Sequence, residues 1–379
     1  MTASSEKANI KGGENDVISS MRRDWKNRLL AHVLRQQWDF DHGHKSSAKE
    51  DITVLTEIKH IKIPPADALD LDTVMAIYQA LRPIMPVAGR SGACQTASRL
   101  IDILNEFDGL VLDGYGVINI GDGPIEGVKT LLDTAASKAK PVLVLTNGGS
   151  FSAERVFVKY QDWQLPIKRG DILSSRDALV AQFAGPSETP LATDDVIGCF
   201  GRVIEPLAGK NIMLYGRDDD FWNRADAFVF LGAIEWNESD QLAFEAAMIA
   251  RPRPVHIANP DVAAPQANDR FSTEPGYWSA RMMQQAAIRA IEVDVRWYGK
   301  PYQSAFDLAL ARMARLLDRP LNRKRIAMVG DSLHTDILGG NAAGMTSVLV
   351  TDHGLFRSRA ASPYCTACDI HPDWMVSGL

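Results

Sequence analysis

The stretch from about residue 107 to 150 constrains the fold of this chain most strongly, because it predicts strand, turn, helix, strand and turn in succession. Residues 109–112 form a short apolar run that stops at Asp113, as expected of a buried strand that ends in a polar loop. Residues 127–136 have helical spacing, and residues 141–145 form a second buried-strand run. A helix between two such strands indicates a βαβ unit, and therefore an α/β fold with a parallel sheet.

Polar side chains follow both strands. Asp113 comes directly after the first run, and Thr146 and Asn147 come after the second. In open parallel sheets, ligands bind beyond the carboxyl ends of the strands, so these side chains are candidates for one binding site. On these two loops alone, an equal alternative is that Asp113 caps a helix and that Thr146 and Asn147 form an ordinary turn.

A third loop favours the binding site. Residues 325–329 form another apolar strand, which runs into Asp331 and, five residues later, Asp336; a small-residue helix over 337–344 and a strand over 346–350 follow. Two carboxylates at this spacing after a parallel strand suit a metal ion that prefers oxygen ligands, such as Mg²⁺.

Four short segments together carry a family resemblance, and they occur in the order Asp113-x-Tyr115-Gly116-Val117, Leu145-Thr146-Asn147, Gly299-Lys300-Pro301 and Gly330-Asp331-x-x-x-Thr335-Asp336. They resemble the four motifs of the haloacid dehalogenase superfamily of hydrolases. Asn259-Pro260-Asp261 resembles the class IIA branch, that of the nitrophenylphosphatase and nucleotide phosphatase type. The resemblance covers roughly residues 100 to 379 and implies a Rossmann-like parallel-sheet core with an inserted α/β cap domain of the C2 type.

The pattern and the resemblance together predict three parts of the chain. Residues 1–98 would form a mainly helical, partly disordered extension, residues 99–175 and 251–379 the hydrolase core, and residues 176–250 the α/β cap. Pro252 and Pro254 would mark the return to the core.

The amino-terminal extension lies outside the resemblance. We predict helices over residues 17–38, 71–81 and 96–105 from the spacing of their apolar residues. We expect this extension to serve packing or oligomerisation.

The resemblance implies a role for each motif residue. Asp113 would attack phosphorus to give an aspartyl-phosphate, and Lys300 would neutralise the developing charge. Phosphate oxygens would be held by Gly114, Thr146, Asn147 and Lys300. Mg²⁺ would be held by Asp113, Asp331 and the main-chain carbonyl of Tyr115, with Asp336 acting through water or orienting the other ligands.

Tyr115 departs from the family pattern, because phosphatases of this family carry a second aspartate there as general acid and base. A phenol with an unperturbed pKa of ~10 can donate a proton at neutral pH, but it regenerates a base poorly. Losing a general acid or base typically costs about 10² to 10⁴ in rate, so a slow enzyme is expected unless another group substitutes. His334 and Asp122 are the candidates for that substitution.

Three hypotheses about function follow. The main one is a Mg²⁺-dependent phosphatase of a small phosphorylated metabolite. The second is a catalytically weak protein that binds a phosphorylated ligand for regulation. The third is a haloacid dehalogenase, because true dehalogenases also have Tyr at this position, although they lack the paired aspartates kept here at Asp331 and Asp336.

Charge and composition limit the kinds of partner and the cell compartment that we expect for this chain. The formal net charge of −6, with no basic run, argues against nucleic-acid binding, and no window of 18 apolar residues predicts a membrane span. Four cysteines in 379 residues do not make a disulfide framework, so we expect the cytoplasm. In the cap, Arg217 and residues 218–220 either face the substrate or form a solvated loop.

Overall fold

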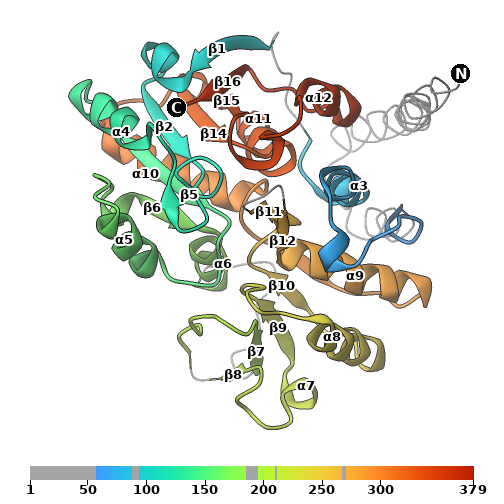
Figure 1. Cartoon of the computed structure of the whole chain (residues 1–379). Coiled ribbons are helices and arrows are strands. Elements are labelled where there is room, and N and C mark those ends of the chain that lie inside the picture. Colours follow the sequence, from blue (N-terminus) through green and yellow to red (C-terminus); the bar gives the residue numbers. More distant parts are fainter. Residues whose placement is uncertain (1–56, 88–93, 185–194, 210, 267–269) are drawn as a thin grey trace, which may run out of the picture.

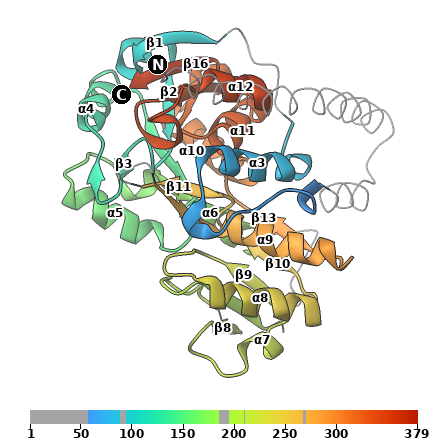
Figure 2. The same ribbon diagram turned by 45° about the vertical axis from the view of Figure 1, so that its right-hand side comes forward.

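The structure is a computed structural model that describes residues 57–87, 94–184, 195–209, 211–266 and 270–379 (Figure 1). The helix expected over residues 17–38 lies outside the described residues. Two parallel sheets organise the rest of the chain, and the smaller one lies below the larger one in both Figure 1 and Figure 2.

The larger sheet has seven strands, and every neighbouring pair is parallel. Their order is β1 (Gln95–Arg99), β16 (Trp374–Gly378), β15 (Thr346–Val350), β14 (Ile326–Gly330), β2 (Gly109–Leu112), β5 (Val142–Thr146) and β6 (Ile172–Ser174). The α/β fold with a Rossmann-like parallel core that the sequence predicts is therefore confirmed.

Helices cover both faces of this sheet, and the apolar runs alternate between them. Leu110 and Leu112 of β2 pack in a cluster with α4 (Val128–Ser137), whereas Val111 packs in a cluster with α10 (Gln303–Leu317). Successive strand residues point to opposite faces, so both faces of β2 are apolar and the strand is buried throughout. The remaining helices around the sheet are α5 (Ala153–Asp162), α6 (Ser175–Ala184), α11 (Leu338–Ala342) and α12 (Ser362–Cys368).

The smaller sheet has five strands, again with parallel pairs only. Their order is β13 (Val295–Trp297), β10 (Val255–Ile257), β9 (Ala227–Phe230), β7 (Ile197–Phe200) and β8 (Ile212–Leu214). Its helices are α7 (Phe221–Arg224), α8 (Glu238–Ala250) and α9 (Pro275–Ile288). An aromatic cluster around Phe200 fills its core, with ring centroids of Phe228, Phe230, Trp236 and Phe244 at 4.5 to 5.6 Å.

The expected boundary between the cap and the core at residue 251 is wrong, as the strands of the two sheets show. Both β10 and β13 fall within the range that we expected to form the core, but they belong to the smaller sheet, because Val255 pairs with Phe228 of β9 and with Val295 of β13. The chain therefore re-enters the larger module after Trp297.

The expected helix over residues 96–105 is also wrong. Residues 95–99 form β1, an edge strand paired with β16 alone, and Leu100–Glu106 form a 3₁₀ turn. The division at residue 98 thus falls inside a strand of the larger sheet. Because β1 is largely exposed, it lacks the apolar alternation that would have revealed it.

The expected helix over residues 71–81 is confirmed as α3 (Leu71–Leu81). Asp70 caps it, since its carboxylate accepts a 2.8 Å hydrogen bond from the amide of Thr73. Figure 2 shows α3 above α9. Across the parts of the chain that the structure describes, every helix is too short or too polar to cross a lipid bilayer.

Candidate active site

Three aspartates meet at the carboxyl edge of β2 and β14. Each of Asp113, Asp331 and Asp336 offers a carboxylate oxygen, and these oxygens lie within 4.8 Å of one another. All three side chains are buried. The residue ranges described here hold no second group of three or more His, Cys, Asp or Glu side chains that converges in this way.

Backbone hydrogen bonds hold the three aspartates in place. The amide of Asp113 donates to the carbonyl of Val329 at 2.8 Å, which ties the end of β2 to β14. The carboxylate of Asp331 accepts from the amide of Leu355 at 2.9 Å. The carboxylate of Asp336, on a π-helical turn over Leu333–Ile337, accepts from the amide of Ser332 at 3.1 Å.

Two glycines bring backbone directly against Asp331. Gly116 and Gly354 have φ of +86° and +79°, and a Cβ at either position would overlap the Asp331 carboxylate. Both the left-handed backbone and the missing side chain are therefore needed here. The peptide that joins Tyr115 to Gly116 consequently lies beside the aspartate cluster.

Lys300 is the cation at the centre of the cluster. Its Nζ lies 2.5 Å from Asp113 Oδ1 and 2.7 Å from Asp336 Oδ1, and its side chain is 1% exposed. Burial would lower its pKa, but the charges of Asp113, Asp336 and Asp261 outweigh burial and raise it, so the ammonium stays protonated.

The cluster contains three acidic groups and one basic group. Burial, and next the charge of Asp336, raise the pKa of Asp113 and of Asp331 above the usual range of a carboxyl group. One ammonium faces three carboxyls, and all the converging ligand atoms are carboxylate oxygens. Mg²⁺ prefers such ligands, and a divalent cation would balance the excess charge, so the residues present fit Mg²⁺.

The side chain of Asn147 holds the backbone of Lys300 in place and does not point to the three clustered aspartates. Its Oδ1 accepts from the amide of Lys300 at 2.7 Å, and its Nδ2 donates to the carbonyl of Lys300 at 3.0 Å. The same Nδ2 also donates to Asp261 Oδ1 at 2.9 Å. The sequence indicated that Asn147 belongs to the site, but not that it positions the lysine, because the two residues are 153 positions apart.

The other two residues expected to hold phosphate lie side by side. The backbone of Gly114 is next to the side chain of Thr146, whose Oγ1 accepts from the amide of Gly148 at 3.1 Å. The amide of Gly114 donates to Asp113 Oδ1 at 2.6 Å. The structure therefore brings Gly114, Thr146 and Lys300 together around Asp113.

The hydroxyl of Tyr115 is held by a neighbouring hairpin. It accepts from the amide of Gly121 at 2.8 Å, in the turn between β3 (Asn119–Ile120) and β4 (Gly123–Pro124). Burial raises the pKa of this phenol above its ordinary value, so the phenol is even less often ionised at neutral pH than that of a free tyrosine.

Neither proposed substitute for the missing aspartate has the environment of a general acid. His334 is fully buried and stacks on Tyr78 of α3, with ring centroids 4.8 Å apart, and burial lowers its pKa well below the usual value. Asp122 is exposed in the turn between β3 and β4. His334 faces α3, and Asp122 faces solvent.

Two further acids border the site and were not predicted as site residues. Asp261 follows β10 and contacts Asn147, and Glu274 accepts from Asn259 Nδ2 at 3.1 Å. Burial raises the pKa of each carboxyl to about 7. Asp261 belongs to the Asn259-Pro260-Asp261 segment, which indicated the branch of the family. That segment did not predict the contact between Asp261 and Asn147.

These two acids predict that the metal-free protein loses stability as pH rises. Between about pH 4 and pH 7 the folded state still binds protons that the unfolded state has released, so the free energy of unfolding falls across this interval. We expect a decrease of several kcal/mol, on the order of 3 to 4 kcal/mol for each acid, measured by urea unfolding at several pH values. Asp261→Asn should flatten this dependence, and an unchanged slope in that variant would contradict the assignment.

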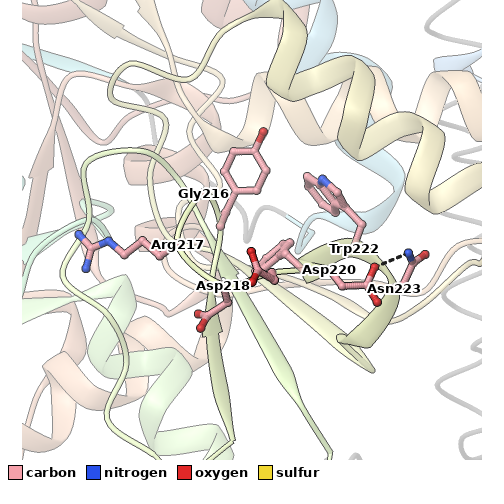
Figure 3. Close-up of a pocket in the computed structure, with 9 residues that line it drawn as sticks. Gly216, Arg217, Asp218, Asp220, Trp222 and Asn223 are labelled. Carbon is pink, nitrogen blue, oxygen red and sulfur yellow. Dashed lines mark hydrogen bonds between the residues drawn. The ribbon is translucent and has the colours of Figure 1, made fainter.

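The acidic loop of the cap is a separate feature. A hollow is lined by residues 215–223, which form the loop after β8 and the first turn of α7. Figure 3 shows the side chains of these residues. Asp218 accepts from the amide of Leu214, and Asp220 accepts from Asn223. Figures 1 and 2 both place this loop at the end of the molecule away from β2, and residues 216–220 are exposed, so it is a solvated loop and does not face the aspartates.

Comparison with protein-family models gives two matches in one superfamily. Residues 110–198 match the model described as haloacid dehalogenase-like hydrolase, and residues 297–377 match one described as HAD-hydrolase-like. The first match contains Asp113 and Asn147, and the second contains Lys300, Asp331 and Asp336.

Curated relatives are distant. An acid sugar phosphatase of Staphylococcus aureus is 23% identical over 247 residues, which are 65% of this chain and 87% of that protein. A protein of Caenorhabditis elegans named as a NipSnap protein is 25% identical over 273 residues, which are 65% of this chain and 48% of that protein. The chain thus spans about half the length of the nematode relative.

Solved structures share the fold. A possible sugar phosphatase of the HAD superfamily from Cytophaga hutchinsonii superposes with a TM-score of 0.64 and 22% identity, covering 76% of this chain and 98% of that chain. A p-nitrophenyl phosphatase from Archaeoglobus fulgidus gives a TM-score of 0.53 and 19% identity, covering 72% and 96%.

Proposed function

Since the chain belongs to the haloacid dehalogenase-like hydrolases, we propose that it is a Mg²⁺-dependent phosphatase that acts through an aspartyl-phosphate at Asp113. The observation that carries this proposal is the convergence of Asp113, Asp331 and Asp336 around the buried ammonium of Lys300. Such a site can hold a phosphoryl group against a carboxylate nucleophile, because a nearby cation offsets the repulsion between the two anions.

The proposed reaction has two steps. A carboxylate oxygen of Asp113 attacks phosphorus, and the bond between phosphorus and the ester oxygen of the substrate breaks, with the departing oxygen taking a proton from solvent. Water then attacks the phosphorus of the aspartyl-phosphate and loses a proton to solvent, and the bond between phosphorus and the Asp113 oxygen breaks, which releases inorganic phosphate and regenerates the carboxylate. Lys300 stabilises the charge on the phosphoryl oxygens in both steps, and Thr146 and the amides around Gly114 and Asn147 orient them.

Magnesium, held by Asp113, Asp331, Asp336 and the carbonyl of Tyr115, would supply further positive charge to the phosphoryl group. Asn147 keeps Lys300 at its place through the two hydrogen bonds to the lysine backbone. Asp336 reaches Lys300 directly, so it orients the ammonium whether or not it also touches the metal ion.

The substrate class that we propose is a small phosphorylated metabolite, such as a sugar phosphate. The names of the Staphylococcus aureus and Cytophaga hutchinsonii relatives support a sugar phosphate. The four cysteines are free thiols, which supports the proposal of a reducing cytoplasm, and the net charge of −6 supports the proposal that nucleic acid is no partner.

Tyr115 favours a second candidate function. Because its phenol is held by Gly121 and is a poor base, the protein could turn over slowly and act chiefly by binding a phosphorylated ligand. The two candidates differ in how fast the natural chain itself turns over, and a carboxyl group introduced at position 115 tests whether Tyr115 is what limits that turnover.

We therefore expect Tyr115→Asp to hydrolyse an aryl phosphate about 10- to 100-fold faster than the natural chain in the presence of Mg²⁺. The added carboxyl group can protonate the leaving oxygen and then activate water. Release of inorganic phosphate measures the effect. Tyr115→Asn is the matched control, because it has nearly the same size and hydrogen-bonding shape as the aspartate but no transferable proton. Equal rates for these two variants would refute a missing acid as the limit on turnover.

A further inference from the structure

Residues 57–86, which we call the amino-terminal strap, lie across the boundary between the larger and smaller modules. On the smaller module, the hydroxyl of Tyr277 in α9 donates to the carbonyl of Pro64 at 2.7 Å, and Gln284 Nε2 donates to the carbonyl of Ile58 at 2.8 Å. On the larger module, the hydroxyl of Tyr364 in α12 donates to Asp72 at 2.6 Å. The strap therefore joins the two modules.

Within the strap, Tyr78 reaches two loops of the candidate active site at once. Its ring stacks on His334 with an interplanar angle of 3°, and its hydroxyl accepts from the amide of Val262 at 3.0 Å. The side chain is 1% exposed. Beside it, Gln79 Nε2 lies 2.8 Å from His334 Nε2, which gives the histidine a second contact from the same helix.

Each of these loops carries a residue of the site. His334 lies on the π-helical turn that presents Asp336, two positions before it. Val262 directly follows Asp261, whose carboxylate contacts Asn147, and Asn147 holds the backbone of Lys300. The ring of Tyr78 thus supports the turn that carries Asp336. Its hydroxyl supports the loop whose contacts place Lys300.

We propose that Tyr78 is a positioning residue, which fixes the turn that carries Asp336 relative to the loop that anchors Lys300. This inference rests on the proposed function, because it assigns Tyr78 to the geometry of that same metal site. Tyr78 lies outside both segments that match the family models, so this chain supplies the support from its own amino-terminal region.

Two features separate this role from ordinary packing. The stack is nearly parallel and joins Tyr78 to a histidine that is itself fully buried, so a smaller side chain would leave a cavity against the turn. The hydroxyl satisfies a buried backbone amide, a contact that phenylalanine would lose. Removing the ring should therefore loosen the turn, and removing only the hydroxyl should loosen the loop of Val262.

The test compares Tyr78→Phe and Tyr78→Leu with Tyr277→Phe in the full chain. Tyr277 is also a buried tyrosine, and its hydroxyl bonds to the same strap, but its contact is with Pro64, away from the site. Two quantities are measured: hydrogen exchange of the peptide covering residues 331–337 without metal, and the Kd for Mg²⁺ from isothermal titration calorimetry at a fixed temperature.

We expect exchange of residues 331–337 to be about 10-fold faster in Tyr78→Leu, and the Kd for Mg²⁺ to rise by about 10-fold. Tyr78→Phe should give about a 3-fold rise, because the stack remains. Tyr277→Phe should stay within about 2-fold of the natural chain in both quantities, although it loses a hydrogen bond of similar length.

Equal behaviour of the Tyr78 variants and Tyr277→Phe would overturn the positioning role. If Tyr78→Leu does not fold, Tyr78→Phe against Tyr277→Phe decides the question. If the natural chain shows no response to Mg²⁺, that result counts against the proposed function, whereas exchange of residues 331–337 in the metal-free variants still decides whether Tyr78 orders the turn.

Discussion

Asp113→Asn should reduce Mg²⁺-dependent phosphate release from an aryl phosphate by about 10⁴-fold or more, an effect of the size seen when a nucleophile is removed. An amide oxygen is far less nucleophilic than a carboxylate, so no aspartyl-phosphate can form. The substitution keeps the volume of the side chain. Lys300 retains its contact with Asp336 at 2.7 Å, so the cluster keeps one ion pair.

The fold of this variant has to be checked separately. The substitution leaves the backbone bond from residue 113 to Val329 intact, so we expect the Tm to change little or to rise as charge repulsion in the cluster falls. A matched control is Asp122→Asn, which removes an exposed carboxylate from the nearby turn. Residual turnover in Asp113→Asn within about 10-fold of the natural rate would exclude Asp113 as the nucleophile.

The parts of the fold that the sequence predicts are those with a strong apolar pattern. The strands over residues 109–112 and 346–350 agree with β2 and β15 at both ends, because buried parallel strands form unbroken apolar runs. The edge strand β1 escaped prediction because its exposed residues carry no such run. The sheet to which β10 belongs depends on its pairing with Phe228 and Val295, which no local apolar pattern reveals.

In the candidate site too, local patterns predict some features, whereas contacts between distant residues decide the others. Asp113 and Asp331 could be placed together because the carboxyl ends of neighbouring parallel strands share one edge of a sheet. The orientation of His334 could not, because it depends on contacts with Tyr78 and Gln79, which lie far earlier in the chain and outside the motifs. Motifs identify which residues gather, whereas long-range contacts decide which way each side chain turns.

Lys300→Met should destabilise the metal-free protein by about 3 kcal/mol near neutral pH, since it removes the cation from a buried cluster of three carboxyls. Methionine fills a similar volume, and the bonds from Asn147 to the backbone of residue 300 remain, so loss of charge is the main change. Turnover should fall by about 10² to 10³, because the ammonium no longer stabilises the phosphoryl oxygens.

The pH dependence of this loss identifies its cause. Burial already raises the pKa of Asp113, and removing the ammonium raises it further, so at low pH the carboxyls are neutral and the variant should be nearly as stable as the natural chain. The deficit should grow as pH rises, and saturating Mg²⁺ should reduce it. Urea unfolding with and without Mg²⁺ measures both effects.

Adding Asp336→Asn to Lys300→Met should recover part of the stability, because it removes one of the unbalanced charges. A deficit that is independent of pH and of Asp336 would mean that Lys300 contributes by packing, and the ammonium would then not be what holds the three aspartates together.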